Sequence, residues 1–264
     1  MSNYWAEREA KHIEEMLKRH VNYEQEIHRR YLQLWKTIEA EIQQFYVAYA
    51  GKEKINIDEA KRCASKHDVQ IFAEKAKRYV QTRDFSKEAN EQLRLYNLTM
   101  KVNRLELLKS KIGLYLTDNT NQLQTYFTAM LTEESVAEFV RQAGILGESV
   151  LSEETYRLFT KAIIEGSFHN ATFSQRLWAN QDVLKASIDR LLTVGLAAGK
   201  HPDVLARELR RLVVIDSLRG KETADYVARR LMISESARIQ SEVQKQSYEK
   251  YGYEEYNLIV EPSA

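Results

Sequence analysis

The first fifty residues carry the clearest hydrophobic pattern in the chain. Between Asn3 and Ala50 there is neither glycine nor proline, and apolar residues recur along one side at alternating steps of four and three. This heptad rhythm predicts one long helix over residues 3–50, with an apolar seam suited to packing against another helix. We expect this seam to be a partner-binding or self-association face, with candidate residues Trp5, Tyr31, Trp35, Ile38, Ile42 and Phe45. Alternatively, the seam packs inside the chain against residues 86–131.

Four further helices are predicted in the first 165 residues. Thr132 and Ser152 are each followed by two glutamates, as is typical of helix N-termini, where a hydroxyl caps free amides and acids suit the helix dipole. Between Ser86 and Leu131 apolar residues fall on two faces, which indicates a helix packed between neighbours. The predicted helices span residues 57–83, 86–131, 132–147 and 152–165.

A stretch without clear periodicity separates two regions of the chain. The apolar residues of 166–173 recur at neither helical nor strand spacing. We therefore expect one region at 1–165 and a second at 174–264. In the second region, Gly199 is expected to end one helix and Pro202 to begin the next.

The end of the chain changes character. A last long helix is expected to end at Gly252, and residues 255–260 then have the composition of a β-strand, with four residues after it. A lone strand has no sheet of its own. Such a strand can add to the sheet edge of a partner, which would satisfy its backbone donors and acceptors.

Composition favours a mainly α fold. Glycine (9) and proline (2) are scarce in the 264 residues, which favours long uninterrupted helices. We therefore predict an elongated protein of several long antiparallel helices with the single C-terminal strand. Cys63 is the one cysteine and has no disulfide partner within the chain, and no apolar run approaches the ~20 residues of a membrane anchor.

No catalytic or metal-binding motif stands out. Glu9 and His12 have the Glu-x-x-His spacing of carboxylate-bridged di-iron bundles, but the motif occurs once where such sites need it twice. Gly195 to Lys200 lacks the spacing of a phosphate-binding loop and follows a predicted helix instead of a strand. We expect no catalytic residues, no metal site and no cofactor, and we do not expect an enzyme.

Charge is balanced overall and basic in two places. The totals are 39 basic and 38 acidic residues, so no global field points to nucleic acid. Between Glu74 and Lys111 there are ten basic residues against five acidic ones, and between Lys200 and Arg238 nine against six. These clusters suit phosphate contacts, and a solvated helix face explains them equally well. The candidate DNA-contacting residues are Lys75, Lys77, Arg78, Arg83, Arg207, Arg210 and Arg211.

Three ordered stretches carry a family resemblance. They are a Phe-Ser-x-Arg-x-Trp stretch, a glycine-rich stretch that leads into a Pro-x-x-Leu-Ala helix start, and an arginine followed by a Ser-Glu-x-x-Arg stretch. The chain thereby resembles the phage minor capsid or head-morphogenesis family, the Mu-F-like group that accompanies a portal protein. The residues that carry the likeness are Phe173, Ser174, Arg176, Trp178, Gly195, Gly199, Pro202, Arg230, Ser234, Glu235 and Arg238.

The resemblance implies a structural virion component that binds the portal inside the head and assists head assembly, DNA ejection or both. It implies a location in the capsid interior near the portal after synthesis in the bacterial host cytoplasm, with the portal, double-stranded DNA, and scaffolding or major capsid protein as partners. The alternative is an internal virion protein that coats or protects the genome through non-specific DNA binding.

The chain departs from the family pattern in two places. Ser234 stands where the family has threonine, and the Cys-x-x-Cys segment that usually follows the strand is not present. The resemblance therefore implies that the strand at 255–260 is the first strand of a C-terminal module that is missing here, as an alternative to pairing with a partner. Individual motif residues also have structural interpretations. We expect Trp178 in a core, Gly195 at a close helix crossing, and Arg176, Glu235 and Arg238 as structural anchors.

Overall fold

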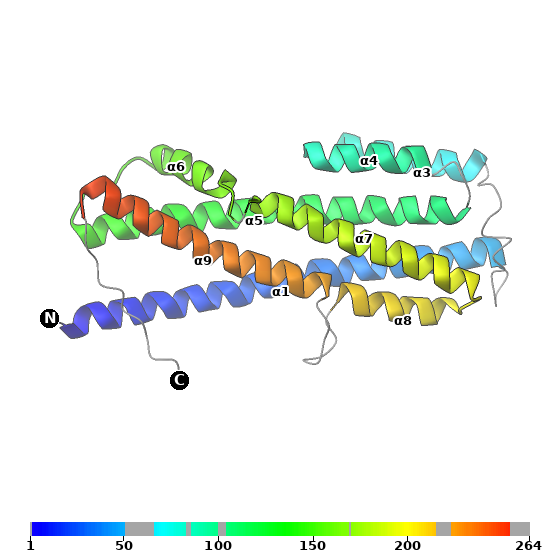
Figure 1. Ribbon diagram of the computed structural model, residues 1–264, viewed down its shortest axis with the longest axis horizontal. Coiled ribbons are helices and arrows are strands. Elements are labelled where there is room, and N and C mark those ends of the chain that lie inside the picture. The colour runs from blue at the N-terminus through cyan, green and yellow to red at the C-terminus, as the bar shows by residue number, and fades with distance from the viewer. Residues whose placement is uncertain are drawn as a thin grey trace. The chain divides into compact units, whose positions relative to one another are not determined.

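A computed structural model describes residues 2–50, 66–82, 86–99, 104–168, 170–214 and 223–253 (Figure 1). Nearly all of them are helical, which confirms the mainly α prediction. The helices are α1 (Ser2–Ala50), α3 (Lys66–Thr82), α4 (Lys87–Thr99), α5 (Arg104–Leu146), α6 (Glu153–Glu165), α7 (Phe173–Ala197), α8 (Pro202–Val213) and α9 (Ala224–Tyr251). Within the described residues the one β pairing is an isolated bridge between Phe168 and Ala171. The strand predicted at residues 255–260 lies outside them.

The chain forms two compact units that interleave along the sequence. Unit 1 comprises Met1–Gln124 and Ser174–Leu231, and unit 2 comprises Thr125–Phe173 and Met232–Ala264. Helices α5 and α9 therefore each supply residues to both units. This differs from the sequential division into residues 1–165 and 174–264, because no break in composition marks the points inside a continuous helix where the unit changes.

The helix boundaries differ from the predicted ones around Thr132. α5 continues through this residue, and the Thr132 hydroxyl donates to the Thr128 carbonyl at 2.6 Å instead of capping a new helix. Ser152 is a true N-cap, with extended backbone and a hydroxyl that accepts from the Thr155 amide at 3.3 Å. A hydroxyl followed by acids therefore marks a helix start only where the backbone also leaves the helical conformation. The predicted helix start at residue 57 lies outside the described residues.

Antiparallel helices enclose the core of unit 1. Arg30 of α1 contacts Gln122 of α5, and Glu41 further along α1 contacts Lys111 earlier in α5, so the two helices run in opposite directions. Ile38 and Ile42 of α1 are completely buried. A second apolar cluster joins α3, α4, α5 and α7, and Figure 1 shows α3 and α4 beside the first part of α5. It contains Phe72, Ala76, Ala89, Leu93, Leu107, Leu114 and Trp178.

Helix α8 covers part of the α1 seam. The indole of Trp35 donates to the Ala206 carbonyl at 3.4 Å, and the Tyr46 hydroxyl donates to the Lys200 carbonyl at 2.7 Å. The guanidinium of Arg210 lies 4.9 Å from the centre of the Trp35 ring, within cation–π range.

The partner-binding face predicted on α1 is therefore wrong for the residues whose side chains are described. Tyr31, Ile38, Ile42 and Phe45 are buried and Trp35 is half-buried, because the chain's own helices occupy the seam. The alternative of internal packing holds, with α8 as well as α5 covering the face. The side chain of Trp5 lies outside the description.

The turn between α7 and α8 explains the glycines and proline of the second motif stretch. A Cβ atom at Gly195 would lie 2.2 Å from Cδ2 of the fully buried Leu205, so any larger residue here would force the Leu205 side chain to shift within the core. Gly199 has a positive φ of 63°, as expected of a residue that ends a helix. Pro202 occupies the first turn of α8, and the preceding His201 is the N-cap, whose Nδ1 accepts from the Asp203 amide at 3.3 Å.

Unit 2 has an unusually polar interior. Among the residues of α5, α6 and α9 that belong to this unit, several buried side chains carry charge or hydrogen-bonding groups. The Ser236 hydroxyl donates to Glu134 at 2.6 Å, and the Thr160 hydroxyl donates to Ser135 at 2.9 Å. Aromatic packing accompanies these bonds, since Phe139 and Tyr156 stack with their ring centres 5.1 Å apart.

Candidate functional site

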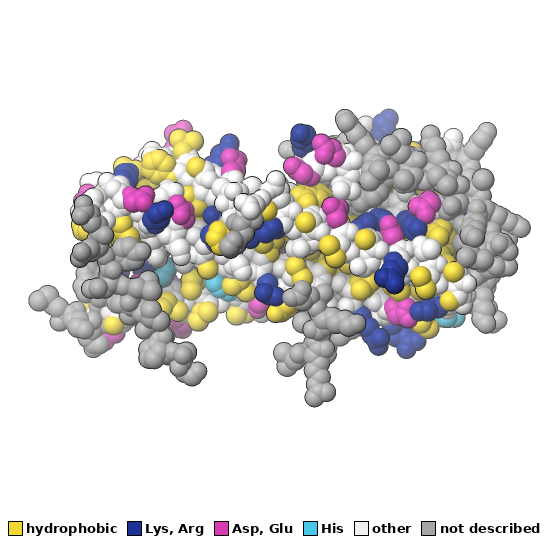
Figure 2. Space-filling view, viewed as in Figure 1, with side chains coloured by type: hydrophobic (Ala, Val, Ile, Leu, Met, Phe, Trp, Pro, Cys, Tyr) yellow, Lys and Arg dark blue, Asp and Glu magenta, His cyan; other side chains and the backbone are white. Residues whose placement is uncertain are grey.

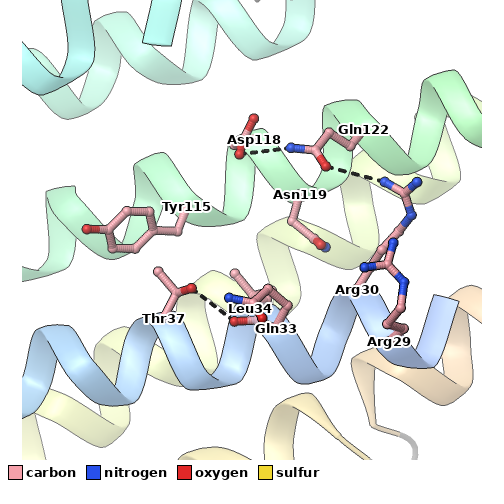
Figure 3. A pocket seen from close by; sticks show the side chains of 9 residues that line it. All are labelled: Arg29, Arg30, Gln33, Leu34, Thr37, Tyr115, Asp118, Asn119 and Gln122. Atoms are coloured by element: carbon pink, nitrogen blue, oxygen red, sulfur yellow. Dashed lines mark hydrogen bonds between the residues drawn. The ribbon is translucent and has the colours of Figure 1, made fainter. Parts of the chain in front are cut away.

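A polar hollow of about 210 Å³ lies between α1 and α5 in unit 1 (Figure 3). Helix α1 contributes Arg29, Arg30, Gln33, Leu34 and Thr37. Helix α5 contributes Tyr115, Asp118, Asn119 and Gln122. Leu34 is the one aliphatic side chain of the lining, so this hollow offers hydrogen-bonding groups and charges to a ligand.

A chain of hydrogen bonds crosses the hollow from one helix to the other. Arg30 donates from Nε to Glu26 Oε1 at 2.8 Å and from Nη1 to Gln122 Oε1 at 3.3 Å. Gln122 in turn donates from Nε2 to Asp118 Oδ2 at 3.0 Å. The side-chain amide of Gln122 therefore lies between the Arg30 guanidinium and the Asp118 carboxylate. Figure 3 shows these three side chains, Arg30 on α1 and the other two on α5. The Arg30 side chain is only 20% exposed, so its guanidinium is held in place.

The two arginines of the hollow share one carboxylate. Arg29 binds Glu26 with two bonds of 2.7 Å, in addition to the bond from Arg30. The hydrogen bond from Arg29 and the charges of both arginines hold the pKa of Glu26 below its ordinary value. Glu26 therefore stays ionised and accepts hydrogen bonds from both arginines.

Tyr115 connects the hollow to a buried ionic cluster. Its hydroxyl donates to Glu41 Oε2 at 2.7 Å, and Lys111 Nζ donates to Glu41 Oε1 at 2.6 Å. Lys75 of α3 lies 3.8 Å from the same carboxylate, contacts the Tyr115 hydroxyl and lies 4.6 Å from the centre of the Tyr115 ring. The cluster thus links α1, α3 and α5.

The electrostatics of this cluster favour the ionised form of Glu41. Burial alone would raise the pKa of Glu41, but the hydrogen bond and charge of Lys111, the Tyr115 hydroxyl and the charge of Lys75 outweigh it and lower the pKa. Burial lowers the pKa of Lys75, and the Lys111 charge adds to this effect against the opposing attraction of Glu41. A carboxylate with three donors around it is a stabilised ion pair, as expected of a structural junction between helices.

A second buried carboxylate, Asp225, ties the start of α9 to α1. Its Oδ2 lies 2.6 Å from Nδ1 of His28, and its Oδ1 lies 2.9 Å from Nε of Arg229. Asp225 is completely buried, and its negative charge adds to the effect of burial, which raises the pKa of the nearby Tyr31 hydroxyl. His28 therefore has a structural role, as a partner for a carboxylate 197 residues away.

The motif residues of the family resemblance occupy structural positions. Trp178 is buried in the core, as expected, and its indole donates to Gln124 at 2.7 Å. Phe173 is also buried, with its ring centre 6.4 Å from that of Phe127. Ser174 and Arg176 are half-buried in unit 1.

The last motif stretch lies on α9. Glu235 is buried and forms an ion pair of 2.9 Å with Arg238, which also donates to the Ile163 carbonyl at 3.2 Å. Ser234 is exposed, and Arg230 is exposed with its guanidinium 5.5 Å from the centre of the Tyr226 ring. The pair of Glu235 and Arg238 thus anchors α9 to the end of α6, as expected, whereas Arg176 belongs to the other unit.

Some of the candidate DNA-contacting residues are exposed, and others contact residues of neighbouring helices. Lys77, Arg78, Arg207 and Arg211 are exposed, and Figure 2 shows basic side chains gathered over α8. Lys75 is engaged by the Glu41 cluster and Arg210 by Trp35, so these two have internal roles that the sequence did not reveal. Arg83 lies outside the described residues.

Two further features of the described part of the chain bear on its chemistry. No group of three or more histidine, cysteine, aspartate or glutamate side chains is placed there to hold a metal ion. None of the described helices has the length and apolar character needed to cross a membrane.

Comparison with known proteins gives no assignment. No family model matches this chain, and neither a curated protein nor a solved structure matches it.

Proposed function

We propose that this chain is a structural minor capsid protein of a tailed phage that binds the portal inside the head. It assists head assembly, DNA ejection or both, and it acts by binding, without enzymatic chemistry. It is made in the host cytoplasm and resides in the virion interior near the portal, where scaffolding or major capsid protein are further partners.

The observation that carries this proposal is the ordered series of motif stretches from Phe173 to Arg238. The places of these residues are consistent with architectural roles. Trp178 is in a core, Gly195 permits the close approach of Leu205, and Glu235 is paired with Arg238. Side chains that serve helix packing in this way support a role as a binding scaffold.

Co-sedimentation with the portal protein encoded in the same genome tests the proposal. The purified chain is mixed with assembled portal at low and at physiological salt. We expect it to sediment with the portal at both salt concentrations, because apolar helical contacts are little screened by salt. Absence of co-sedimentation at both concentrations contradicts the proposal.

A second candidate function, non-specific DNA binding, is supported by the exposed arginines on α8. Arg207 and Arg211 lie one helical turn apart on the outer face of that helix, as phosphate contacts require. Changing both to glutamine should reduce the slope of log K against log salt by about 2 if each contacts a phosphate. The matched control is the same change at Arg157 and Lys161, which are exposed on α6. An unchanged slope in the Arg207 and Arg211 variant removes this candidate.

A further inference from the structure

Helix α6 of unit 2 has an exposed apolar face. Leu158 is 66% exposed and Phe159 is 38% exposed, and Ala162, one turn after Leu158, is exposed as well. Figure 2 shows apolar side chains gathered over this helix. We propose that this face binds the chain's own C-terminal segment, residues 256–260. The contact is independent of the portal-binding role proposed above, because α6 carries none of the motif residues.

Helix α9 ends beside α6. Lys250, in the last turn of α9, has its Nζ 5.4 Å from the centre of the Phe159 ring. Just after the helix, the Tyr253 hydroxyl donates to the carbonyl of Leu146, the last residue of α5, at 3.3 Å. Gly252 has a positive φ of 75°, which turns the chain out of the helix. The segment that follows Tyr253 therefore starts next to α6.

Residues 256–260 can reach Leu158 from this starting point. Leu258 is the fifth residue after Tyr253, and an extended chain covers up to about 3.3–3.6 Å per residue, or about 17 Å over five residues. An α-helix with its side chains is about 10–12 Å across. This length therefore carries the segment from the Lys250 side of α6 around to Leu158.

The side chains of the segment match the spacing of the apolar face. In an extended conformation Tyr256, Leu258 and Val260 lie on one face, because side chains alternate along a strand. Side chains two residues apart in such a chain are about 6.6 Å apart, and residues four apart in a helix are separated by about 6 Å along its axis. Leu258 and Val260 can therefore pack on Leu158 and Ala162 together, which removes apolar surface from water on both sides.

The covalent link favours this segment over a second copy of the chain as the occupant. Only a few residues separate Tyr253 from the apolar residues of the segment. A short linker gives a tethered group an effective concentration in about the millimolar range. A second copy would compete for the face only at the concentration of the protein itself.

Paramagnetic relaxation in the ¹⁵N-labelled full chain tests the contact. A chain with the changes Cys63→Ser and Ser263→Cys carries a nitroxide on its one cysteine, beyond the proposed contact. We expect the nitroxide to broaden the amide signals of residues 157–162 more than those of α8, relative to the reduced nitroxide. Broadening that is no stronger in α6 than in α8 overturns the proposal.

A mixed sample identifies the molecule that supplies the segment. It contains ¹⁵N-labelled chain without nitroxide and an equal amount of unlabelled chain that carries the nitroxide. We expect no broadening of α6 in this sample, because the proposed contact is intramolecular. Equal broadening in the mixed sample would mean that a second copy covers the face, and it overturns the proposal.

Variants separate a bound segment from one that is only tethered. Leu158→Asp changes an exposed residue and should weaken the contact about tenfold or more, as expected from loss of the burial of a leucine side chain. Leu258→Asp should weaken it by a similar factor from the other side. The matched control is Val183→Asp at a 69% exposed position of α7, which should leave the broadening of α6 unchanged. Undiminished broadening of α6 in Leu158→Asp and Leu258→Asp overturns the proposal, because a segment that is only tethered would give it.

Discussion

The interior of unit 2 holds a larger share of polar side chains than the interior of unit 1, which buries charge at Glu41 and Asp225 but is otherwise mostly apolar. On α1 of unit 1, Ile27, Ile38 and Ile42 are completely buried in an apolar seam. In unit 2, buried positions on α5 and α9 hold Glu138 and Glu235, each paired with a nearby arginine. An apolar seam gains stability from the area that it buries, whatever the partner helix. A polar interior gains stability only where each buried polar group bonds to its particular partner. It therefore tolerates fewer alternative helix registers than an apolar seam does.

The largest effect is expected from Glu138, a buried carboxylate of unit 2 with several hydrogen-bond partners. Two bonds of 2.7 and 2.8 Å join it to Arg141, and amides of Gln142 and Gln244 donate to it at 2.7 and 2.9 Å. Glu138→Gln leaves Arg141 without its charge partner and should lower the free energy of unfolding by about 3–5 kcal/mol. Urea denaturation measures the change.

The control for this change is Glu153→Gln. Glu153 forms an exposed ion pair with Arg157 at 2.7 Å, so its substitution should alter stability by at most about 1 kcal/mol. Equal effects of the two changes would contradict the structural role of the Glu138 network.

The Glu138 variant should also change the response to acid. Burial alone would raise the pKa of Glu138, but Arg141 and the two amides outweigh it and lower the pKa. A carboxyl group with a lowered folded-state pKa contributes stability above its unfolded pKa of about 4.3, and this stability is lost as the pH falls through the folded-state value. Denaturation from pH 7 downward should therefore show a smaller acid-induced loss in Glu138→Gln than in the wild type. An identical loss contradicts the assignment.

The next effect is expected in the apolar seam of unit 1. Ile38→Ala removes three buried carbon atoms and should reduce the free energy of unfolding by about 2–5 kcal/mol. Val47→Ala, at a position of the same helix that is 77% exposed, is the matched control and should change little. Urea denaturation of both variants distinguishes a buried seam from a free partner-binding face, for which Ile38→Ala would also have little effect.

A smaller effect is expected at the approach of α7 to α8. Gly195→Ala forces a Cβ atom against the buried Leu205 and should destabilise the protein by about 1–3 kcal/mol. Gly144→Ala on α5, where nothing lies within 4 Å of the added atom, should stabilise it by up to about 1 kcal/mol. Thermal denaturation measures whether each variant is less or more stable than the wild type. A stabilised Gly195→Ala variant would rule out the close approach of Leu205 to Gly195.

The smallest effect is expected at the two positions where a hydroxyl residue is followed by two glutamates. Ser152→Ala removes a helix N-cap and should lower stability by about 1 kcal/mol. Thr132→Ala, in the middle of α5, should change stability by less than about 0.5 kcal/mol. Equal losses in thermal denaturation would mean that Thr132 also caps a helix.

Much of the helical structure was predictable from the sequence. The seam of α1, the stop at Gly199, the cap at Ser152 and the glycine at position 195 all follow local rules of periodicity, capping and steric size. These rules hold because they involve residues close together in the chain.

Contacts between distant residues were not predictable in the same way. Lys75 and Arg210 look like surface cations in the sequence, but Glu41 and Trp35 engage them in the structure. The hollow was missed because Arg30 and Gln122 are 92 residues apart, although the spacing of Glu26 with Arg29 and Arg30 was visible as helical ion pairs. The polar interior of unit 2 was missed because buried glutamates interrupt the apolar pattern that marks a core.

Amide hydrogen exchange on Glu138→Gln and Ile38→Ala at neutral pH tests the central claim, that the interior of each unit is stabilised by its own buried contacts. We predict that Glu138→Gln lowers protection first in α6 and in residues 232–251 of α9, and that Ile38→Ala lowers it first in α1 and α8. Loss of protection in the same amides and by the same factor in both variants would contradict this account.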